Sequence, residues 1–213
     1  MRVKTAFIGS VLAIALHNVD ACAAPTAETW VSDPVGTWME ISFTHSNLFV
    51  NTTTIPNSIA TVVFSGDNVE NAKFNISCAP ESIWSHNSLF VTMLREKGFF
   101  DAAKNPTIYF TSTSIKKQNA DTYEVKGNLS MNRVTRPVTL AMTASKIVPF
   151  DGVKFRAFTL TGIVDRKDFG MNFQEPKELQ DDPLFGKTWN IKFTVEVTDK
   201  PNASKYVPPT VAD

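Results

Sequence analysis

Ile191-Lys192-Phe193-Thr194-Val195-Glu196-Val197 is the stretch of sequence that decides the fold. Its odd-numbered residues are apolar and its even-numbered residues are polar. Because successive side chains of a β-strand point to opposite faces, this alternation predicts a strand with one buried face and one face in water. An antiparallel β-protein is the fold class that such a strand favours.

The same period of two residues recurs along the chain. It is carried by Met39, Ile41 and Phe43, by Phe74, Ile76 and Cys78, by Tyr123, Val125, Leu129 and Met131, and by Val138, Leu140 and Met142. Residues 59–64, 107–112 and 155–164 also have the composition of strands. Turn signals separate these segments, which is typical of an antiparallel sandwich or barrel. With 191–197 they make about eight strands, enough to close a small barrel.

One segment departs from this period. Between Ser88 and Lys97 the apolar residues Leu89, Phe90, Met93 and Leu94 recur at helical spacing. Asn87 or Ser88 would cap the beginning of the helix, and Gly98 would mark its exit. The sequence therefore predicts one short helix over about 88–97, which covers an open end or a side of the β-structure.

Size and charge limit the classes of function. The chain has 213 residues, 43% of them hydrophobic, and a formal net charge of zero. These values are typical of one globular domain with a sizeable core. Basic and acidic residues are interspersed without blocks, so electrostatics favours neither a nucleic acid nor an anionic membrane surface as partner.

The N-terminus has the pattern of a secretory signal. Arg2 and Lys4 precede an apolar run over 6–16, and small residues follow around Ala23. We expect residues 1–23 to be a cleaved leader, residues 24–200 a barrel domain and residues 201–213 a flexible tail. No segment is long and apolar enough to span a bilayer, so the sequence predicts a soluble periplasmic or secreted protein. Lipoprotein anchoring through Cys22 is the alternative.

Side chains that could carry out chemistry are scattered along the chain. Asp165, Asp168 and Glu175 could act as paired carboxylates, but they flank a strand end where solvated turn charges are common. Arg166 and Lys167 at the same turn could instead hold an anionic head group. His45 and His86 lack a neighbouring ligand at metal-binding spacing, and Cys78 shares the face of buried residues. The sequence predicts no enzyme, no cofactor and no metal site.

The aromatic residues are the remaining candidates. The chain contains sixteen phenylalanines and six methionines. Core packing accounts for such residues in most proteins. Their number in a chain of barrel size favours an interior with large, adaptable walls, which suits a lipidic ligand.

A series of short motifs then points to a family. They are Ser32-Asp33-Pro34, Ser82-Ile83, Phe99-Phe100-Asp101, Lys104-Asn105-Pro106-Thr107-Ile108, Phe110-Thr111-Ser112-Thr113, Gly127-Asn128-Leu129, Val134-Thr135-Arg136-Pro137-Val138-Thr139-Leu140 and Asp165-Arg166-Lys167-Asp168-Phe169-Gly170. In this order and spacing the chain resembles the YceI-like family over about residues 30–197. Members are bacterial periplasmic proteins with a lipocalin-like barrel that bind polyisoprenoids and related amphiphiles. Arg133 stands where the family usually has a glycine, so we expect Asn132 to adopt a positive φ at that turn.

The resemblance implies an all-β fold, an eight-stranded antiparallel barrel with a tubular cavity for an apolar chain. We expect this cavity to be lined by Phe43, Phe74, Ile76, Phe99, Phe100, Ile108, Phe110, Leu129, Leu140, Phe158, Phe169 and Phe193. Arg95, Arg136 and Arg166 are the candidates for a head group at the rim, because guanidinium pairs well with phosphate.

The predicted function is the binding, carriage or sequestration of an amphiphilic lipid, such as a polyisoprenoid or an isoprenoid quinone, without catalysis. One rival is an enzyme that acts on such a lipid in the same cavity, although no convergent catalytic set is visible. Another is a filled barrel whose surface binds a protein of an envelope redox or stress system. The sequence leaves open whether the chain forms a homodimer.

Overall fold

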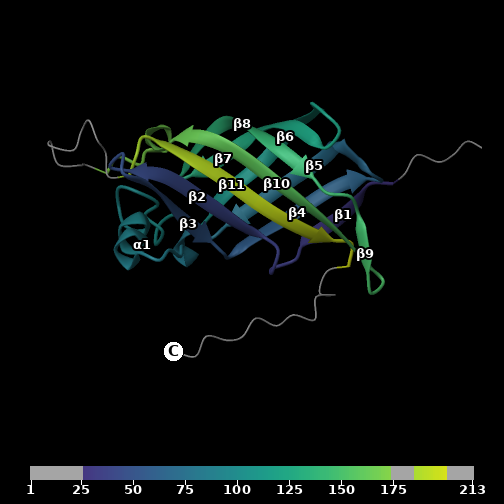
Figure 1. Cartoon of the computed structure of the whole chain (residues 1–213), viewed down its shortest axis with the longest axis horizontal. Helices are drawn as coiled ribbons and strands as arrows, with labels where there is room; N and C mark the ends of the chain where they lie inside the picture. The colour runs from purple at the N-terminus through teal and green to yellow at the C-terminus, as the bar shows by residue number, and fades with distance from the viewer. Residues whose placement is uncertain (1–25, 174–184, 201–213) are drawn as a thin grey trace, which may run out of the picture.

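The computed structural model describes residues 26–173 and 185–200 (Figure 1). The predicted leader, the predicted tail and Glu175 lie outside these ranges. Within them the chain forms one antiparallel sheet, one α-helix and two short 3₁₀ helices, η1 (Pro80–Ser82) and η2 (Arg166–Phe169). The strands are β1 (Glu28–Ser32), β2 (Trp38–His45), β3 (Phe49–Ile55), β4 (Ser58–Ser65), β5 (Asn68–Cys78), β6 (Ile108–Lys117), β7 (Thr122–Met131), β8 (Val134–Ala144), β9 (Val148–Phe150), β10 (Val153–Asp165) and β11 (Thr188–Thr198).

Eight of the described strands close into a barrel, in the order β1, β4, β5, β6, β7, β8, β10 and β11. The ring closes because β11 pairs with β10 along one edge and with β1 at Val197 and Thr198 on the other. The ring itself has no free edge, while β3 and β9 lie at the two ends of the sheet outside it. The predicted eight-stranded antiparallel barrel is confirmed.

The ring differs by one strand from the eight segments that the sequence pattern marked. It includes β1, which the pattern did not mark, and it leaves out β2. The short strand β1 closes the ring, and β2 pairs with β11 beside it, at Asn190–Thr194. The hairpin of β2 and β3 therefore extends the wall toward α1. The strands β1, β3 and β9 escaped the sequence analysis because their apolar residues do not form a sustained alternation.

The helix α1 (Ser88–Arg95) lies at one end of the barrel next to β3 (Figure 1). The side chain of Asn87 caps it by accepting hydrogen bonds from the backbone N–H groups of Leu89 and Phe90. Phe90 and Leu94 form its buried face. The predicted helix is confirmed, and it ends two residues earlier than expected because Glu96 is extended.

The turn between β7 and β8 lies at the same end as α1. Asn132 has a φ of 47° and Arg133 a φ of 61°, so both residues of this hairpin turn are left-handed. The expectation of a positive φ at Asn132 is confirmed. Its side chain donates to the Phe169 carbonyl and accepts from Asn105, which holds the turn against η2.

A valine at Gly127 is expected to lower the free energy of unfolding by about 2 kcal/mol. Gly127 faces the interior from β7, and a Cβ atom there would lie 2.5 Å from a ring carbon of Phe110 and 2.6 Å from the Thr111 carbonyl oxygen. The aromatic ring occupies the space that the missing side chain leaves. Urea unfolding followed by circular dichroism measures the change.

The matched control for Gly127→Val is Asn128→Val, at the next position of β7, where the side chain is exposed. We expect this variant to unfold within about 0.5 kcal/mol of the natural chain. Equal stabilities of the two variants would contradict the packing of Phe110 over Gly127.

Candidate functional site

The barrel interior is the candidate functional site. All twelve residues predicted to line it are buried, with at most 2% of their surface exposed. For those on strands the period of two residues turns the side chain inward, whereas Phe99 and Phe100 lie in a turn and Phe169 in η2. Their role as the lining of a ligand cavity stays a prediction.

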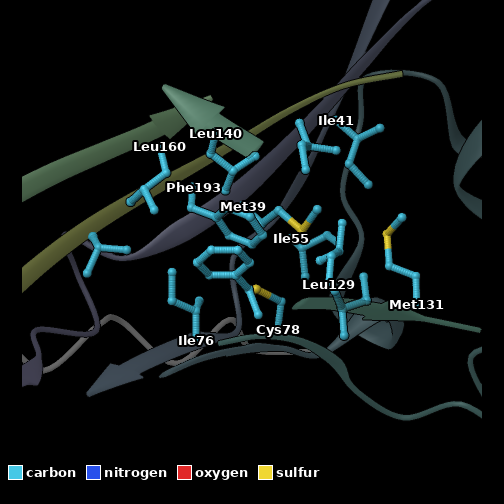
Figure 2. Close-up of a cluster of buried hydrophobic side chains, with 14 of the residues drawn as sticks. Met39, Ile41, Ile55, Ile76, Cys78, Leu129, Met131, Leu140, Leu160 and Phe193 are labelled. Atoms are coloured by element: carbon cyan, nitrogen blue, oxygen red, sulfur yellow. The ribbon is translucent and has the colours of Figure 1, made fainter. Parts of the chain in front are cut away.

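The middle of the interior is a layer of aliphatic, aromatic and sulphur-containing side chains. Figure 2 shows residues of this layer, among them Met39, Leu129, Leu160 and Phe193, which come from different strands and point toward one another. The rings of Phe110 and Phe193 stack with their centroids 5.8 Å apart. Methionine is flexible and polarizable, so a layer that includes it can repack around a guest.

An aromatic cluster fills the end of the barrel next to α1. The indole of Trp189 lies between the rings of Phe43, Phe99 and Phe100, with centroid distances of 5.7, 6.2 and 5.8 Å. The ring of Phe185 packs against Phe99 at 4.5 Å. The sequence analysis did not select Trp189 or Phe185, although Trp189 shares the odd-numbered parity of Phe193 on β11.

The opposite end of the barrel is lined by Trp30, Phe64, Phe74, Phe158 and a charged residue. Phe74 and Phe158 meet edge to face at 4.9 Å. Arg156 is 6% exposed and lies with its guanidinium over the Phe64 and Phe158 rings, at 5.4 and 5.5 Å from their centroids. The sequence analysis missed it. The signal was present, because Arg156 has the parity of the inward residues Phe158 and Leu160.

Two of the three arginines predicted at the rim lie near the surface at the α1 end. The Arg95 guanidinium donates to the Ile83 carbonyl at 3.0 Å and lies 3.8 Å from the Glu81 carboxylate. Arg136 is exposed and donates to the Asp168 carbonyl at 3.1 Å. Both tie loops of this end together, and head-group binding by either stays a prediction.

Arg166, the third arginine, lies beneath the surface and not on an exposed rim. It is 2% exposed, and its guanidinium donates to the carbonyls of Gly186 and Met171 at 2.9 and 2.7 Å. The ring of Phe99 lies 5.7 Å from its central carbon. These contacts join the segment after η2 to the segment before β11, so Arg166 has a structural role whether or not it binds a ligand.

Asp165 and Cys78, which the sequence analysis also considered, have structural partners. Asp165 accepts a hydrogen bond from the Lys167 backbone N–H and so caps η2, and it pairs with Lys187 at 3.5 Å. Burial raises the pKa of the Cys78 thiol to about 12, although a hydrogen bond with Ser58 opposes the shift, so the thiol is protonated at neutral pH. In the described ranges no three His, Cys, Asp or Glu side chains are placed to hold a metal ion.

Four grooves lined by described residues lie on the outer surface. The groove of about 470 Å³ crosses β2, β10 and β11, and includes Glu40 and Lys192. Those of about 590 and 570 Å³ lie beside Ile59 and beside Asn172. That of about 550 Å³ lies between β9 and β10 and includes Val148 and Phe150. Exposed residues form much of the walls of these grooves, and the buried Arg156 is also among the residues of the groove between β9 and β10.

Comparison with known proteins identifies the family. The model of the YceI-like domain matches residues 30–197, from the middle of β1 to the last residue but one of β11. This chain belongs to the YceI-like family. The resemblance inferred from the short motifs is thus confirmed.

Curated relatives of the YceI-like chain match part of its length. The UPF0312 protein YE1254 of Yersinia enterocolitica is 37% identical over 101 residues, which are 46% of this chain and 52% of that protein. A UPF0312 protein of Azotobacter vinelandii is 35% identical over 37% of this chain and 41% of its own. The matches therefore span about half the length of these relatives or less.

Solved structures share the barrel. BcnA of Burkholderia cenocepacia superposes with a TM-score of 0.67 at 17% identity and covers 78% of this chain and 98% of its own. The Campylobacter jejuni YCEI protein gives 0.60 at 21% identity over 70% of this chain and 84% of its own. A polyisoprenoid binding domain from Saccharophagus degradans gives 0.57 at 9% identity over 81% and 98%. At these identities the likeness establishes the fold.

Among the described residues, no helix of this YceI-like protein is both long enough and apolar enough to cross a bilayer.

Proposed function

We propose that this YceI-like protein binds an isoprenoid or similar amphiphilic lipid in its barrel without transforming it. The observation that carries the proposal is the closed ring of strands with an apolar interior, continuous from Trp189 at one end to Phe158 at the other. The Saccharophagus degradans domain of the same fold, named for polyisoprenoid binding, supports this choice of ligand class.

The physical argument concerns the tail of the lipid. Burial of roughly 20 methylene-sized groups at about 0.8 kcal/mol each contributes about 16 kcal/mol, which exceeds the cost of ordering a flexible chain. The rings of Phe110 and Phe193 contact each other across the interior, so the tail has to displace them. Side chains such as Met39, Met131 and Met142 can adapt to that change.

The proposed setting is the bacterial envelope. A leader over residues 1–23 would export the chain, and cleavage near Ala23 would release the barrel domain. A protein that encloses an apolar chain could then carry or sequester it in an aqueous compartment.

Uptake of geranylgeraniol tests the proposal. We expect native mass spectrometry of the purified protein with excess lipid to show one added lipid mass per chain. Ile76→Trp, which adds bulk to the interior, is expected to reduce uptake at least tenfold. Ile59→Trp is the matched control, because Ile59 on the neighbouring strand is 66% exposed and Ile76 is 2% exposed. Circular dichroism checks that both variants fold.

A second candidate function is a filled barrel that binds a protein partner through its outer surface. The contacts among the interior rings favour it, and the exposed Phe150 and Val148 beside the groove at β9 would supply an apolar contact area. If the natural chain takes up no lipid, and the fluorescence of its buried tryptophans does not change when lipid is added, lipid binding is contradicted and this candidate is favoured.

A further inference from the structure

Arg156 is a charged side chain inside an apolar barrel. It shares its parity on β10 with Phe158 and Leu160, and its neighbour Ala157 is exposed. The rings of Phe64 and Phe158 lie against the guanidinium. Such contacts orient the planar group and leave its edge available for hydrogen bonds.

The hydrogen bonds of Arg156 are few for a buried guanidinium. Its Nε donates to the Ser145 carbonyl at 3.1 Å, and its two terminal nitrogens share the Asp67 carbonyl at 3.5 and 3.4 Å. A guanidinium has five N–H donors, so two of them have no acceptor among the described residues. No carboxylate in the described part of the chain forms a salt bridge with it.

A buried charge without a partner of opposite charge is costly, and the Arg156 guanidinium is such a charge. Burial lowers the pKa of Arg156, while the more distant charge of Asp67 and then Tyr123 oppose that shift. Arginine nevertheless stays protonated at physiological pH. The end of the barrel remote from α1 therefore carries a fixed positive charge with spare donors.

Arg166 provides the contrast at the α1 end. Its bonds to the Met171 and Gly186 carbonyls are 2.7 and 2.9 Å long, within the usual range for N–H donors. The two longest bonds of Arg156, at 3.4 and 3.5 Å, are beyond that range. An incoming anion would replace weak bonds at Arg156 and strong ones at Arg166.

Arg156 also lies close to solvent. Asp67 is in the turn between β4 and β5, Ser145 follows β8, and both residues are exposed. Figure 1 shows that β9 and the start of β10 lie at the end of the barrel away from α1. A head group at Arg156 could therefore remain near water while its tail extends past Phe158 into the interior.

We propose that Arg156 binds the acidic head group of the lipid, a carboxylate or a phosphate, at the barrel end opposite α1. This inference rests on the proposed lipid-binding function and assigns the class of its ligand. The two oxygens of a carboxylate or phosphate match the paired donors of a guanidinium, and such charge-assisted bonds are shorter and stronger than neutral ones. The arginines predicted at the α1 end are then not required for head-group binding.

The test compares three lipids with the same tail: geranylgeraniol, geranylgeranoic acid and geranylgeranyl monophosphate. We expect the natural chain to bind both acidic lipids at least tenfold more tightly than the alcohol, measured by competition in native mass spectrometry. Arg156→Gln should lose this preference and still bind the alcohol. Arg133→Gln, at an exposed arginine of the β7–β8 turn at the other end of the barrel, is the matched control and should keep the preference.

Equal affinities for the alcohol and the acids in the natural chain would overturn the head-group assignment and leave lipid binding intact. A preference that persists in Arg156→Gln would also overturn it. If that variant does not fold, Arg156→Met and Arg156→Lys replace it, with the preference expected to be lost in the first and reduced in the second. Failure to bind any of the three lipids would instead refute the proposed function.

Inorganic phosphate distinguishes a lipid head group from a free anion as the source of the charge. We expect phosphate in excess not to displace geranylgeranyl monophosphate, because the tail supplies most of the affinity. Displacement at comparable concentrations would show a site for free anions and overturn the lipid assignment.

Discussion

Trp189→Ala is expected to lower the free energy of unfolding by about 4 kcal/mol, the largest effect that we predict for a single substitution. Trp189 has no exposed surface, and its ring lies among Phe43, Phe99 and Phe100. Its indole N–H also donates to the Phe185 carbonyl at 2.8 Å. Alanine would leave a cavity and would leave the Phe185 carbonyl without this donor, and both effects lower the free energy of unfolding.

Chemical denaturation followed by far-ultraviolet circular dichroism, which reports on the strands of the barrel, measures this effect without relying on tryptophan fluorescence. Trp84→Ala is the matched control, because Trp84 is 55% exposed and its link to Thr54 uses backbone atoms. The control should lose no more than about 1 kcal/mol. A loss below 1 kcal/mol for Trp189→Ala as well would contradict a tightly packed cluster at the α1 end.

Arg166→Met is expected to destabilise the protein by about 3 kcal/mol. Methionine conserves much of the apolar length of arginine but leaves the Met171 and Gly186 carbonyls without the donors that reach them now. Each buried acceptor left unpaired costs about 1–3 kcal/mol. The segment before β11 would lose its side-chain bond to Arg166 and keep the backbone bond between Arg166 and Lys187, and the packing of Phe99 would weaken.

The control for Arg166→Met is Arg136→Met. Arg136 is exposed, and its bond to the Asp168 carbonyl can be replaced by water, so we expect a change within about 0.5 kcal/mol. Thermal unfolding of both variants at the same pH gives the comparison. Similar melting temperatures for the two would show that burial of the Arg166 guanidinium contributes little to stability.

A filled interior and lipid binding are compatible if the interior can repack. Phe110 and Phe193 stack on each other in the interior, and the same rings would form part of the wall around a lipid tail. Gly127 provides room for the Phe110 ring against the wall of β7. The comparison of lipid uptake between the natural chain and Ile76→Trp measures whether the interior makes space for the tail.

Much of the interior followed from local sequence. The alternation in β11 identified Phe193 as buried, and the spacing of Phe90 and Leu94 identified the face of α1. These inferences succeed because the side-chain period of a strand or helix depends on backbone geometry within a few residues. The same rule would have placed Arg156 inside the barrel, had its parity with Phe158 been weighed against its charge.

The environment of each arginine could not be predicted in this way. Arg136 and Arg166 both occur in motifs near strand ends, yet the first is exposed and the second is buried. The difference depends on carbonyls of Met171 and Gly186, of which the second is 20 residues from Arg166 along the chain. A periodic pattern contains no information on which distant carbonyls a long side chain will reach.

By itself the sequence determined the fold class, the family and the inward faces of most strands, since these depend on short-range periodicity and on motifs in a set order. Only the tertiary structure decided that β1 closes the ring, that Trp189 organises the α1 end and that Arg156 is left with spare donors at the other. The physical reason is that ring closure, aromatic packing and hydrogen-bond partners join residues far apart in the chain. Their outcome depends on the register of all the strands together.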